Sequence, residues 1–550
     1  MHPGLSAFVL FLLLALTASS QSVPAQIDCA DGPAVTPVSR PNQIEWDKFP
    51  AFTLPFTLIY GGPRLGDAQG RPLRHGFSHL VRINNGEYGT YVAFRQRAIE
   101  WSGFAYGLNQ PWETLLSPWN NDLTAYRARW DQYLSDIAGG QKNAAGQYVF
   151  QGNWLTVDIE RMLPTDARIL RLKTDPGVPA PYRQLGDAAF VTAYKQAMRS
   201  LYADGLRYVR QRTDLAGAGA TLGTYSDVPV LNTYLNIPGN TWADWTTNPG
   251  RVSYLVKDST EQRVGGPFYD QLDVLSPSAY YYYDYPNPLA RDYLAYLLFQ
   301  VEVNRAWSNK PVVPFVWLRY HNSTPFYPNF IQPFMAEATA IFPFFSGASG
   351  LWLWDEPGLD QSRSEVYTAY ERFIGGLYRL SRFADMFTGD RELVIETPAR
   401  DLMDRQLPVW RGVAKGNQIL VAAQNPYATD GQTTTLTVRY KTWQQTITLT
   451  GRDVYLCRHD MGSVTATAPG LADVAVFPNP AVTELNVALG RQPTTPTTLT
   501  LLNTRGRVIV TQTTQQAVET LNVTNLPAGL YVLRITNGTG SQTKKVLITR

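Results

Sequence analysis

Two carboxylates, Asp158 and Glu160, end the run "WLTVDIERM" at residues 154–162, which otherwise has the apolar composition of a buried β-strand. A buried charge is costly unless it is paired or used. Side chains of a strand alternate between its two faces. The even-numbered positions therefore share one face, and these are Trp154, Thr156, Asp158 and Glu160. The pattern predicts a carboxylate pair on the mixed face of a strand whose other face is apolar.

Two neighbouring carboxylates push their pKa values apart, so one of them can stay protonated at neutral pH and act as a general acid. Glycoside hydrolysis uses such an acid. Clustered carboxylates also hold magnesium or calcium, and a third interpretation is a salt-bridge cluster with Arg161 and Arg168 at the start of a helix. We favour acid catalysis, with no metal and no cofactor, because the other strand ends supply aromatic side chains rather than more acids.

Aromatic and acidic residues recur at the ends of the later strand-like runs. They are Tyr225 and Asp227 in "GTYSDVP", Tyr280 in "SPSAYYYYDYP", Trp317, Arg319 and Tyr320 in "WLRYHN", and Trp352, Trp354, Asp355 and Glu356 in "LWLWDEP". A single ring is more often core than ligand-binding. Their recurrence at successive strand ends indicates one shared face. We predict that substrate is bound there by Tyr225, Asp227, Tyr280, Trp317, Trp352, Trp354 and Glu356.

The elements that would position these residues alternate between strands and helices over residues 51–388. Such alternation favours a (β/α)8 TIM-like barrel, which takes about 250 residues or more and carries its active site at the carboxyl ends of the strands. The second and third strands must lie between His79 and Gly152. The clearest helix begins near residue 187, with Asp187 as its predicted N-cap.

The rest of the chain divides into further segments. Residues 1–20 fit a secretory signal and residues 21–50 an N-terminal arm. Over residues 389–462, short alternating runs rich in Thr and Val replace the helical patterns and predict an accessory β-sandwich. A linker at residues 463–473 leads to residues 474–550, which read as an all-β, immunoglobulin-like domain.

Composition excludes some partners. The chain has 48 basic and 45 acidic residues, a net charge of +3, and no basic run interleaved with aromatics, so nucleic acid is not an expected partner. No stretch after the signal is long and apolar enough to predict a transmembrane segment in the mature chain. The two cysteines, Cys29 and Cys457, could pair in an exported protein or remain as free thiols, and the sequence leaves both open.

Residues 474–550 resemble the C-terminal sorting domain of the type IX secretion system of Bacteroidetes-type bacteria. The resemblance rests on "VFPNPAVTELNV", on "LLNTRGRVI" and on "LPAGLYVLRITNGTGSQTKKVLITR". It implies export through the periplasm and outer membrane, with the secretion machinery as partner and release or surface attachment as the outcome. An ordinary immunoglobulin-like module is the alternative.

Scattered motifs between residues 52 and 357 resemble the hyaluronidase-type glycoside hydrolases, a βα-barrel family. They are "PFTLIYGGP", "VDIERM", "GTYSDVP", "LSPSAY" and "GASGLWLWDEP". The resemblance implies that Glu160 is the general acid and that Asp158 positions a substrate N-acetyl group, whose oxygen attacks the anomeric carbon. It also implies a sugar subsite lined by Tyr225, Tyr280 and either Trp352 or Trp354.

The sequence departs from that family in its fifth-strand turn, which normally contains a cysteine absent from "SDVP", and in lacking the family's disulfide framework. Without an N-acetylated substrate, Glu160 could work with Glu356 or Asp355 as an ordinary carboxylate pair. We therefore expect a secreted glycoside hydrolase-like protein that cleaves a polysaccharide, which could contain N-acetylhexosamine. The alternative function is not enzymatic: the chain could be a non-catalytic carbohydrate-binding or adhesive protein of the cell surface.

Overall fold

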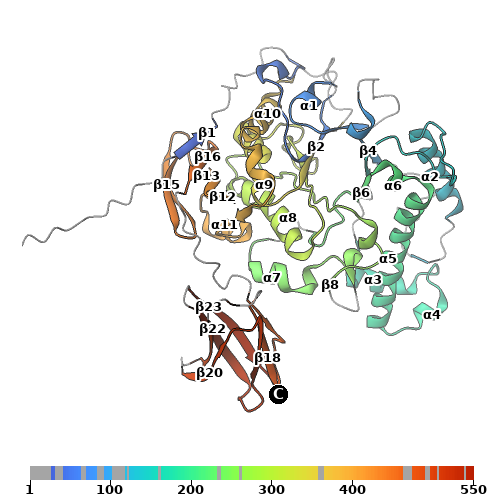
Figure 1. The fold of residues 1–550 in the computed structure, drawn as a ribbon. Helices are drawn as coiled ribbons and strands as arrows, with labels where there is room; N and C mark the ends of the chain where they lie inside the picture. Colours follow the sequence, from blue (N-terminus) through green and yellow to red (C-terminus); the bar gives the residue numbers. More distant parts are fainter. Residues whose placement is uncertain are drawn as a thin grey trace, which may run out of the picture. The chain divides into compact units, whose positions relative to one another are not determined.

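The chain divides into two compact units, residues 1–460 and 461–550, whose hydrophobic cores are separate. The computed structural model (Figure 1) describes residues 26–30, 41–63, 70–82, 92–101, 118–119, 123–158, 163–231, 237–258, 263–356, 365–461, 474–489, 493, 496–504, 507–537 and 540–550. The predicted signal at 1–20 and linker at 463–473 lie outside these ranges.

The first unit is built on a 7-stranded parallel sheet in the order β6-β5-β4-β3-β2-β10-β9. Its strands are β2 (Thr57–Gly61), β3 (His79–Arg82), β4 (Arg97–Trp101), β5 (Trp154–Val157), β6 (Thr221–Thr224), β9 (Phe315–Trp317) and β10 (Gly350–Trp354). β3 and β4 are the second and third strands, within the interval that the sequence predicts. β10 lies close against β2 because Gly350 has no side chain: a Cβ there would stand 2.1 Å from the carbonyl oxygen of Thr57.

Backbone of residues 273–279 joins the two edges of this sheet. On one side Asp273 N donates to Leu222 O and Ser226 N donates to Ser276 O, both at 2.9 Å. On the other side Val313 N donates to Leu275 O and Ala279 N to Phe315 O, again at 2.9 Å. The run was predicted as a strand, but Pro277 has no N–H to give to a ladder, so isolated bridges replace regular pairing. The result is a TIM-like arrangement of parallel strands.

Helices follow the strands along the chain. Their bounds are α1 (Arg71–Arg74), α2 (Thr124–Ile137), α3 (Asp166–Arg171), α4 (Ala180–Arg183), α5 (Asp187–Arg212), α6 (Leu215–Ala218), α7 (Trp242–Thr247), α8 (Tyr293–Trp307), α9 (Pro333–Phe345), α10 (Thr368–Ser381) and α11 (Ala399–Arg405). The helix predicted from residue 187 is α5, but its N-cap is Gly186 and not Asp187. Asp187 is the first helical residue, where its charge favours the amino end and pairs with Lys173 at 2.7 Å.

Successive side chains of each strand point to opposite faces of the sheet, so the strands contribute to two separate hydrophobic cores. The barrel interior is filled by Ile59, Val81, Ala98, Trp154, Val274, Tyr280, Val313, Phe315, Trp317 and Trp352. Leu155 and Val157 belong instead to the core that the strands share with the helices. Thr156 also faces inward, since its hydroxyl accepts a hydrogen bond of 3.0 Å from the indole of Trp154. The predicted faces of residues 154–157 are therefore confirmed, and the inward face of Asp158 stays a prediction.

A 5-stranded antiparallel sheet in the order β1-β16-β13-β12-β11 completes the first unit. Its strands are β1 (Gln26–Cys29), β11 (Glu392–Val394), β12 (Val409–Lys415), β13 (Gln418–Gln424) and β16 (Tyr455–Asp460), with a separate hairpin of β14 (Thr433–Tyr440) and β15 (Trp443–Thr450). Figure 1 shows this sheet beside α9 and α10, and its buried side chains share the helices' core. The expectation that helices vanish after residue 389 is wrong at α11. The division of this region into two sandwich sheets stays a prediction.

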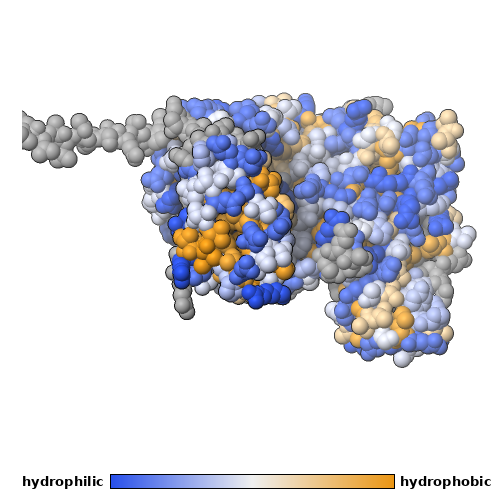
Figure 2. All heavy atoms as spheres, turned by 60° about the horizontal axis from the view of Figure 1, so that its bottom comes forward, coloured by the Kyte–Doolittle hydropathy of each residue, from blue (hydrophilic) through white to orange (hydrophobic). Residues whose placement is uncertain are grey.

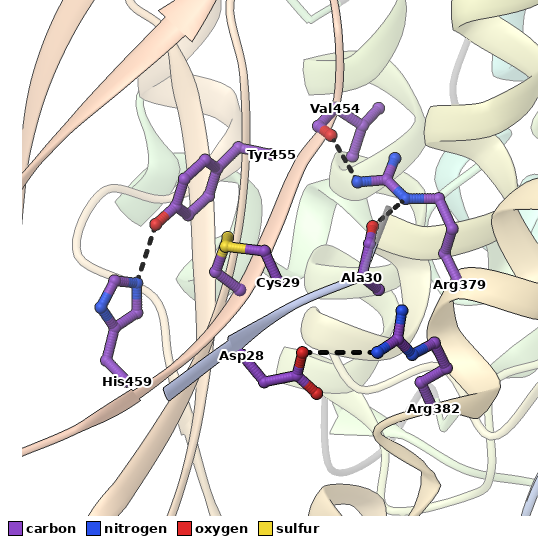
Figure 3. The surroundings of a disulfide bond; sticks show 9 residues. Asp28, Cys29, Ala30, Arg379, Arg382, Val454, Tyr455 and His459 are labelled. Atoms are coloured by element: carbon purple, nitrogen blue, oxygen red, sulfur yellow. Dashed lines mark hydrogen bonds and ion pairs between the residues drawn. A yellow bond between two sulfur atoms is a disulfide. The ribbon is translucent and has the colours of Figure 1, made fainter. Parts of the chain in front are cut away.

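The N-terminal strand β1 is tied to β16 covalently. Cys29 lies directly opposite Cys457 in the antiparallel register, and the two form a disulfide (Figure 3). Arg379 of α10 donates to the carbonyl oxygen of Ala30 at 2.7 Å, and Asp28 pairs with Arg382 at 3.4 Å. The sequence leaves open whether the two cysteines pair, and the structure shows that they form a disulfide.

The second unit consists of two sheets around a core of its own. A 3-stranded sheet has the order β17-β18-β21 and a 4-stranded sheet the order β20-β19-β22-β23. The strands are β17 (Ala475–Phe477), β18 (Glu484–Ala488), β19 (Thr497–Asn503), β20 (Val508–Thr514), β21 (Val518–Asn522), β22 (Gly529–Asn537) and β23 (Gly540–Ile548). Leucines from both sheets, among them Leu485, Leu499 and Leu533, form the core. The predicted all-β character is confirmed.

The face drawn in Figure 2 is mainly hydrophilic, with apolar side chains gathered in patches. The second unit contributes exposed apolar side chains at Phe477, Val482, Val508, Val518, Leu530 and Leu547. Leu530 and Leu547 stand opposite each other on β22 and β23. Neighbouring exposed apolar side chains of this kind are typical of an interaction surface.

Candidate active site

The site is assembled at the carboxyl ends of adjacent strands, beginning with Asp158 directly after β5. Its side chain is 7% exposed. Because Trp154 and Thr156 face the barrel interior, Asp158 continues that inward face. The next strand, β6, runs in register beside it, and Tyr225 N donates to Val157 O at 3.3 Å. Asp158 and Tyr225 follow the paired residues Val157 and Thr224, so strand alternation predicts that their side chains are neighbours on one face.

A continuous aromatic cluster extends from Tyr225 around the barrel. Tyr225 stacks on Tyr280 with ring centroids 5.9 Å apart, and Tyr280 stacks on Trp354 at 6.0 Å. Trp317 lies edge-on to both Tyr280 (5.5 Å) and Trp354 (4.6 Å). The hydroxyl of Tyr225 donates to Ser278 Oγ at 2.9 Å, which fixes the orientation of its ring. Consecutive strand positions thus present one carboxylate and then four aromatic side chains, as the sequence predicts for this face.

The carboxylate of Asp355 fixes the position of the Trp317 ring. It accepts hydrogen bonds from Trp317 Nε1 (2.8 Å), Arg319 Nε (3.0 Å), Tyr370 Oη (2.7 Å) and the backbone N of Glu356 (2.9 Å). Asp355 is 3% exposed and Arg319 is fully buried. A carboxylate engaged by this many donors is a structural anchor. It does not fit the role of second catalytic carboxylate that the sequence leaves open for it.

Arg319 connects that anchor to the loop that follows β10. Its guanidinium makes a bidentate ion pair with Glu365, at 3.0 and 2.7 Å. Burial opposes its charge, but the carboxylates of Glu365 and Asp355 outweigh burial and raise the pKa of Arg319. Arg319 therefore has a structural role at the strand ends.

Glu356, the other acid of "LWLWDEP", is exposed and accepts a hydrogen bond of 2.6 Å from the hydroxyl of Tyr327. The Tyr327 ring in turn lies against Trp317, with centroids 5.8 Å apart. Burial, and then the hydrogen bond to Glu356, raise the pKa of Tyr327. Glu356 thus stands at the edge of the aromatic cluster, where a ligand can reach it.

Asp227 follows a turn that interrupts the strand alternation, and its role in binding substrate stays a prediction. Between it and Tyr225, Ser226 adopts a left-handed conformation with φ of 64°, an unusual backbone state for a residue other than glycine. The turn carries Asp227 towards Thr224, a residue of the outward face of β6. Burial raises the pKa of Asp227 to about 7, against the influence of the Thr224 hydroxyl. Its Oδ2 is buried and meets no hydrogen-bond donor among the described residues.

The remaining predicted residues divide between interior and edge. Trp352 is fully buried, stacked on Phe315 at 4.8 Å, so of the two candidate tryptophans it is Trp354, partly exposed, that reaches the strand ends. Tyr320 is buried and donates to Asp284 at 2.5 Å. Glu160 and Arg161 lie outside the described residues, so the catalytic role of Glu160 stays a prediction. Within the described ranges, no group of three or more His, Cys, Asp or Glu side chains is placed to hold a metal ion.

Sequence reasoning missed Tyr327, Ser278 and the anchoring role of Asp355. Tyr327 lies in the segment after β9, and no periodicity marks it as a neighbour of Trp317. Ser278 could have been found, because it alternates with Tyr280 along one run. The partners of Asp355 come from separate elements, so local sequence carries no sign of them.

Residues 475–549 match the family described as "Secretion system C-terminal sorting domain". The recognition of this domain from its sequence is confirmed, and the chain is a secreted or surface-attached protein whose sorting domain engages the type IX machinery. No described helix combines the length and apolarity needed to cross a membrane. No curated protein matches the chain in sequence.

Solved structures similar to the chain include two named glycosidases. Bee venom hyaluronidase is 16% identical over 50% of this chain and 84% of its own, with a TM-score of 0.33. An endo-β-1,4-mannanase double mutant of Cellulomonas fimi is 11% identical over 82% of this chain and 77% of its own, with a TM-score of 0.27. A conserved exported protein from Bacteroides fragilis is 9% identical over 71% and 77%, with a TM-score of 0.32. At these values the similarities carry no functional argument, and function must be inferred from the residues themselves.

Proposed function

We propose that the first unit is a secreted glycoside hydrolase that cleaves a polysaccharide by carboxylate acid–base catalysis. Two observations support the proposal: the aromatic cluster of Tyr225, Tyr280, Trp317 and Trp354 at the strand ends, and a buried carboxylate, Asp158, directly after β5. Strand alternation predicts that Asp158 faces the same side as the cluster. Carboxylates cleave glycosidic bonds, and flat aromatic rings bind the apolar faces of sugar rings. The carboxyl ends of barrel strands are where such sites form.

In this proposal Glu160 is the general acid, which donates a proton to the oxygen of the leaving sugar. It lies two residues beyond Asp158 on the same run, so strand alternation would direct both to the same side. Two carboxylates held this close to each other would favour one protonated and one ionised form, which is the pairing that general acid catalysis requires. Asp158 then stabilises the positive charge that develops at the anomeric carbon, or holds an N-acetyl group of the substrate against it.

The aromatic side chains would bind and orient the sugar that is cleaved. Tyr225 is fixed through Ser278, and Trp317 is fixed through Asp355, so both rings are held without a ligand. Preorganised rings lose little conformational freedom on binding, which favours both affinity and orientation. Glu356 and Tyr327 lie at the rim of the same cluster and could donate or accept hydrogen bonds with sugar hydroxyls.

The test is release of reducing sugar from polysaccharides with and without N-acetylhexosamine, using the wild-type chain, Glu160→Gln and Asp158→Asn. We expect release from at least one polymer and a loss of about 100-fold or more in kcat for Glu160→Gln, since general acid catalysis contributes about 10²–10⁴-fold. Asp136→Asn, which changes an exposed carboxylate on α2, is the control. Preference for N-acetylated polymers would support the substrate-assisted route.

A carbohydrate-binding protein without catalysis is the competing function, and the same variants separate the two. If all four proteins bind a polymer equally and none of them releases sugar, the aromatic cluster is a binding surface alone. Equal release by wild type and Glu160→Gln would show that catalysis does not use this carboxylate.

A further inference from the structure

Two aromatic side chains, Tyr282 and His321, continue the inward faces of neighbouring barrel segments beyond the aromatic cluster of the candidate site. Along one segment Tyr282 follows Tyr280 by two residues, and along the next His321 follows Arg319 by two. A parallel bridge joins Tyr281 to Tyr320, and His321 N donates to Tyr281 O at 2.8 Å. This register sets Tyr282 and His321 side by side, one step further out than Tyr280.

The two rings form a stacked pair. Their centroids are 4.7 Å apart and their planes differ by 22°. His321 also contacts Tyr280, with centroids 6.0 Å apart and an angle of 40°. Tyr282 and His321 are both partly exposed, whereas Tyr280 is buried. The pair therefore extends the cluster of Tyr225, Tyr280 and Trp354 outward, to where solvent or a ligand can reach it.

The hydrogen bonds of His321 fix which ring nitrogen carries the proton. The backbone N of Ser323 donates to Nδ1 at 3.1 Å, and the hydroxyl of Ser323 lies 2.7 Å from the same atom. A backbone N–H can only donate, so Nδ1 holds its lone pair and the neutral ring carries its proton on Nε2. Burial lowers the pKa of His321, which keeps the ring neutral. Nε2 has no hydrogen-bond partner among the described residues.

We propose that Tyr282 and His321 form an outer sugar-binding subsite, which holds a sugar unit of the polysaccharide adjoining the one bound at Tyr280 and Trp354. A pyranose ring would stack on the outer face of the pair, and His321 Nε2 would donate a hydrogen bond to one of its hydroxyls. The inference rests on the proposed function for its polymer substrate, but it concerns binding and not the chemical step. The hydrogen bonds to Nδ1 hold the ring so that Nε2 offers an oriented N–H donor to a ligand.

The variants that test the subsite are His321→Ala, His321→Phe, Tyr282→Leu and Tyr282→Phe in the full-length chain. His321→Phe keeps the stacked ring and removes the N–H, and Tyr282→Phe keeps the ring and removes the hydroxyl. Phe94→Ala is the matched control, because Phe94 is an exposed ring (37%) that precedes β4 at the opposite end of the barrel. Urea midpoints identify any variant that fails to fold, and in that case the ring-conserving variant of the same residue carries the test.

The assay compares KM and kcat on polymer chains and on the shortest oligosaccharide that is cleaved, from a panel of hyaluronan, chondroitin, glycol chitin and galactomannan. We expect His321→Ala and Tyr282→Leu to raise KM about tenfold on the polymer, with a smaller effect on the shortest substrate. His321→Phe and Tyr282→Phe should show smaller rises than His321→Ala and Tyr282→Leu, because each keeps a ring for stacking. Phe94→Ala should match the wild type. Unchanged KM at every chain length for His321→Ala would overturn the subsite and leave the hydrolase proposal intact.

Affinity electrophoresis in gels that contain the same polymers separates failure of the subsite from failure of catalysis. Retardation of the wild type that is lost in His321→Ala supports the subsite even if no sugar is released. Equal retardation of both proteins, or retardation of neither together with no release, overturns it.

Discussion

The anchoring role of Asp355 predicts a large loss of stability for Asp355→Asn, a change of a single atom. The two oxygens of Asp355 accept hydrogen bonds from Trp317, Arg319, Tyr370 and the backbone of Glu356. An asparagine has one oxygen and one NH₂ group, so at least one of these donors would face another donor. The buried charge of Arg319 would also lose one of its two carboxylates.

The magnitude follows from these losses. Breaking a buried ion pair from one side costs about 3–5 kcal/mol, and hydrogen bonds to charged groups contribute about 1.5–3 kcal/mol each. Glu365 still pairs with Arg319 through two hydrogen bonds, which limits the electrostatic part of the loss. We therefore expect Asp355→Asn to lower the free energy of unfolding by about 3 kcal/mol.

Urea unfolding followed by tryptophan fluorescence measures this change, and the emission of the folded variant also reports on Trp317. Glu356→Gln serves as the control, because Glu356 is exposed and makes one hydrogen bond, to Tyr327. We expect that control to shift stability by less than about 1 kcal/mol. If Asp355→Asn lies within about 0.5 kcal/mol of the wild type, the assignment of Asp355 as the anchor is refuted.

Other perturbations have equally definite outcomes. Cys29→Ser should lower the stability of the first unit by roughly 2–5 kcal/mol, measured as the urea midpoint without reductant, because the disulfide closes a sequence separation of 428 residues; an unchanged midpoint would show that the β1 ladder suffices. The pKa of Asp227 is raised from 3.8 to about 7, so the folded state holds a proton that the unfolded chain releases, and stability falls as pH rises through this interval. Asp227→Asn should therefore gain stability relative to the wild type as the pH rises from about 4 to about 7, and a constant difference between the two urea midpoints would contradict this. Deletion of residues 474–550 should leave the chain in the periplasm, as cell fractionation can show, and secretion of the truncated chain would contradict the sorting role.

The sequence by itself determined the features that depend on local periodicity. The alternation of residues 154–157 predicted that Trp154 faces inward while Leu155 and Val157 pack under the helices, and the structure confirms it. The sorting domain could likewise be recognised from its own motifs. The face on which a strand residue lies can be predicted from the alternation of its sequence neighbours alone. The aromatic residues at the ends of the later strands could therefore be assigned to one face from the sequence.

Tertiary structure decided which of those residues meet and what each one does. The run at residues 273–279 resembles a strand in sequence, but its proline makes it a bridged segment between β6 and β9. Asp355 and Glu356 are equivalent in sequence pattern, yet one is buried among donors and the other is exposed at the rim. Ser226, between Tyr225 and Asp227, adopts a left-handed backbone with φ of 64°, which the alternation of a strand does not predict. The Cys29–Cys457 bond depends on β1 pairing with β16, far along the chain. These features depend on contacts between residues that are remote in sequence. The energies of those contacts exist only in the folded chain, so the local sequence does not reveal them.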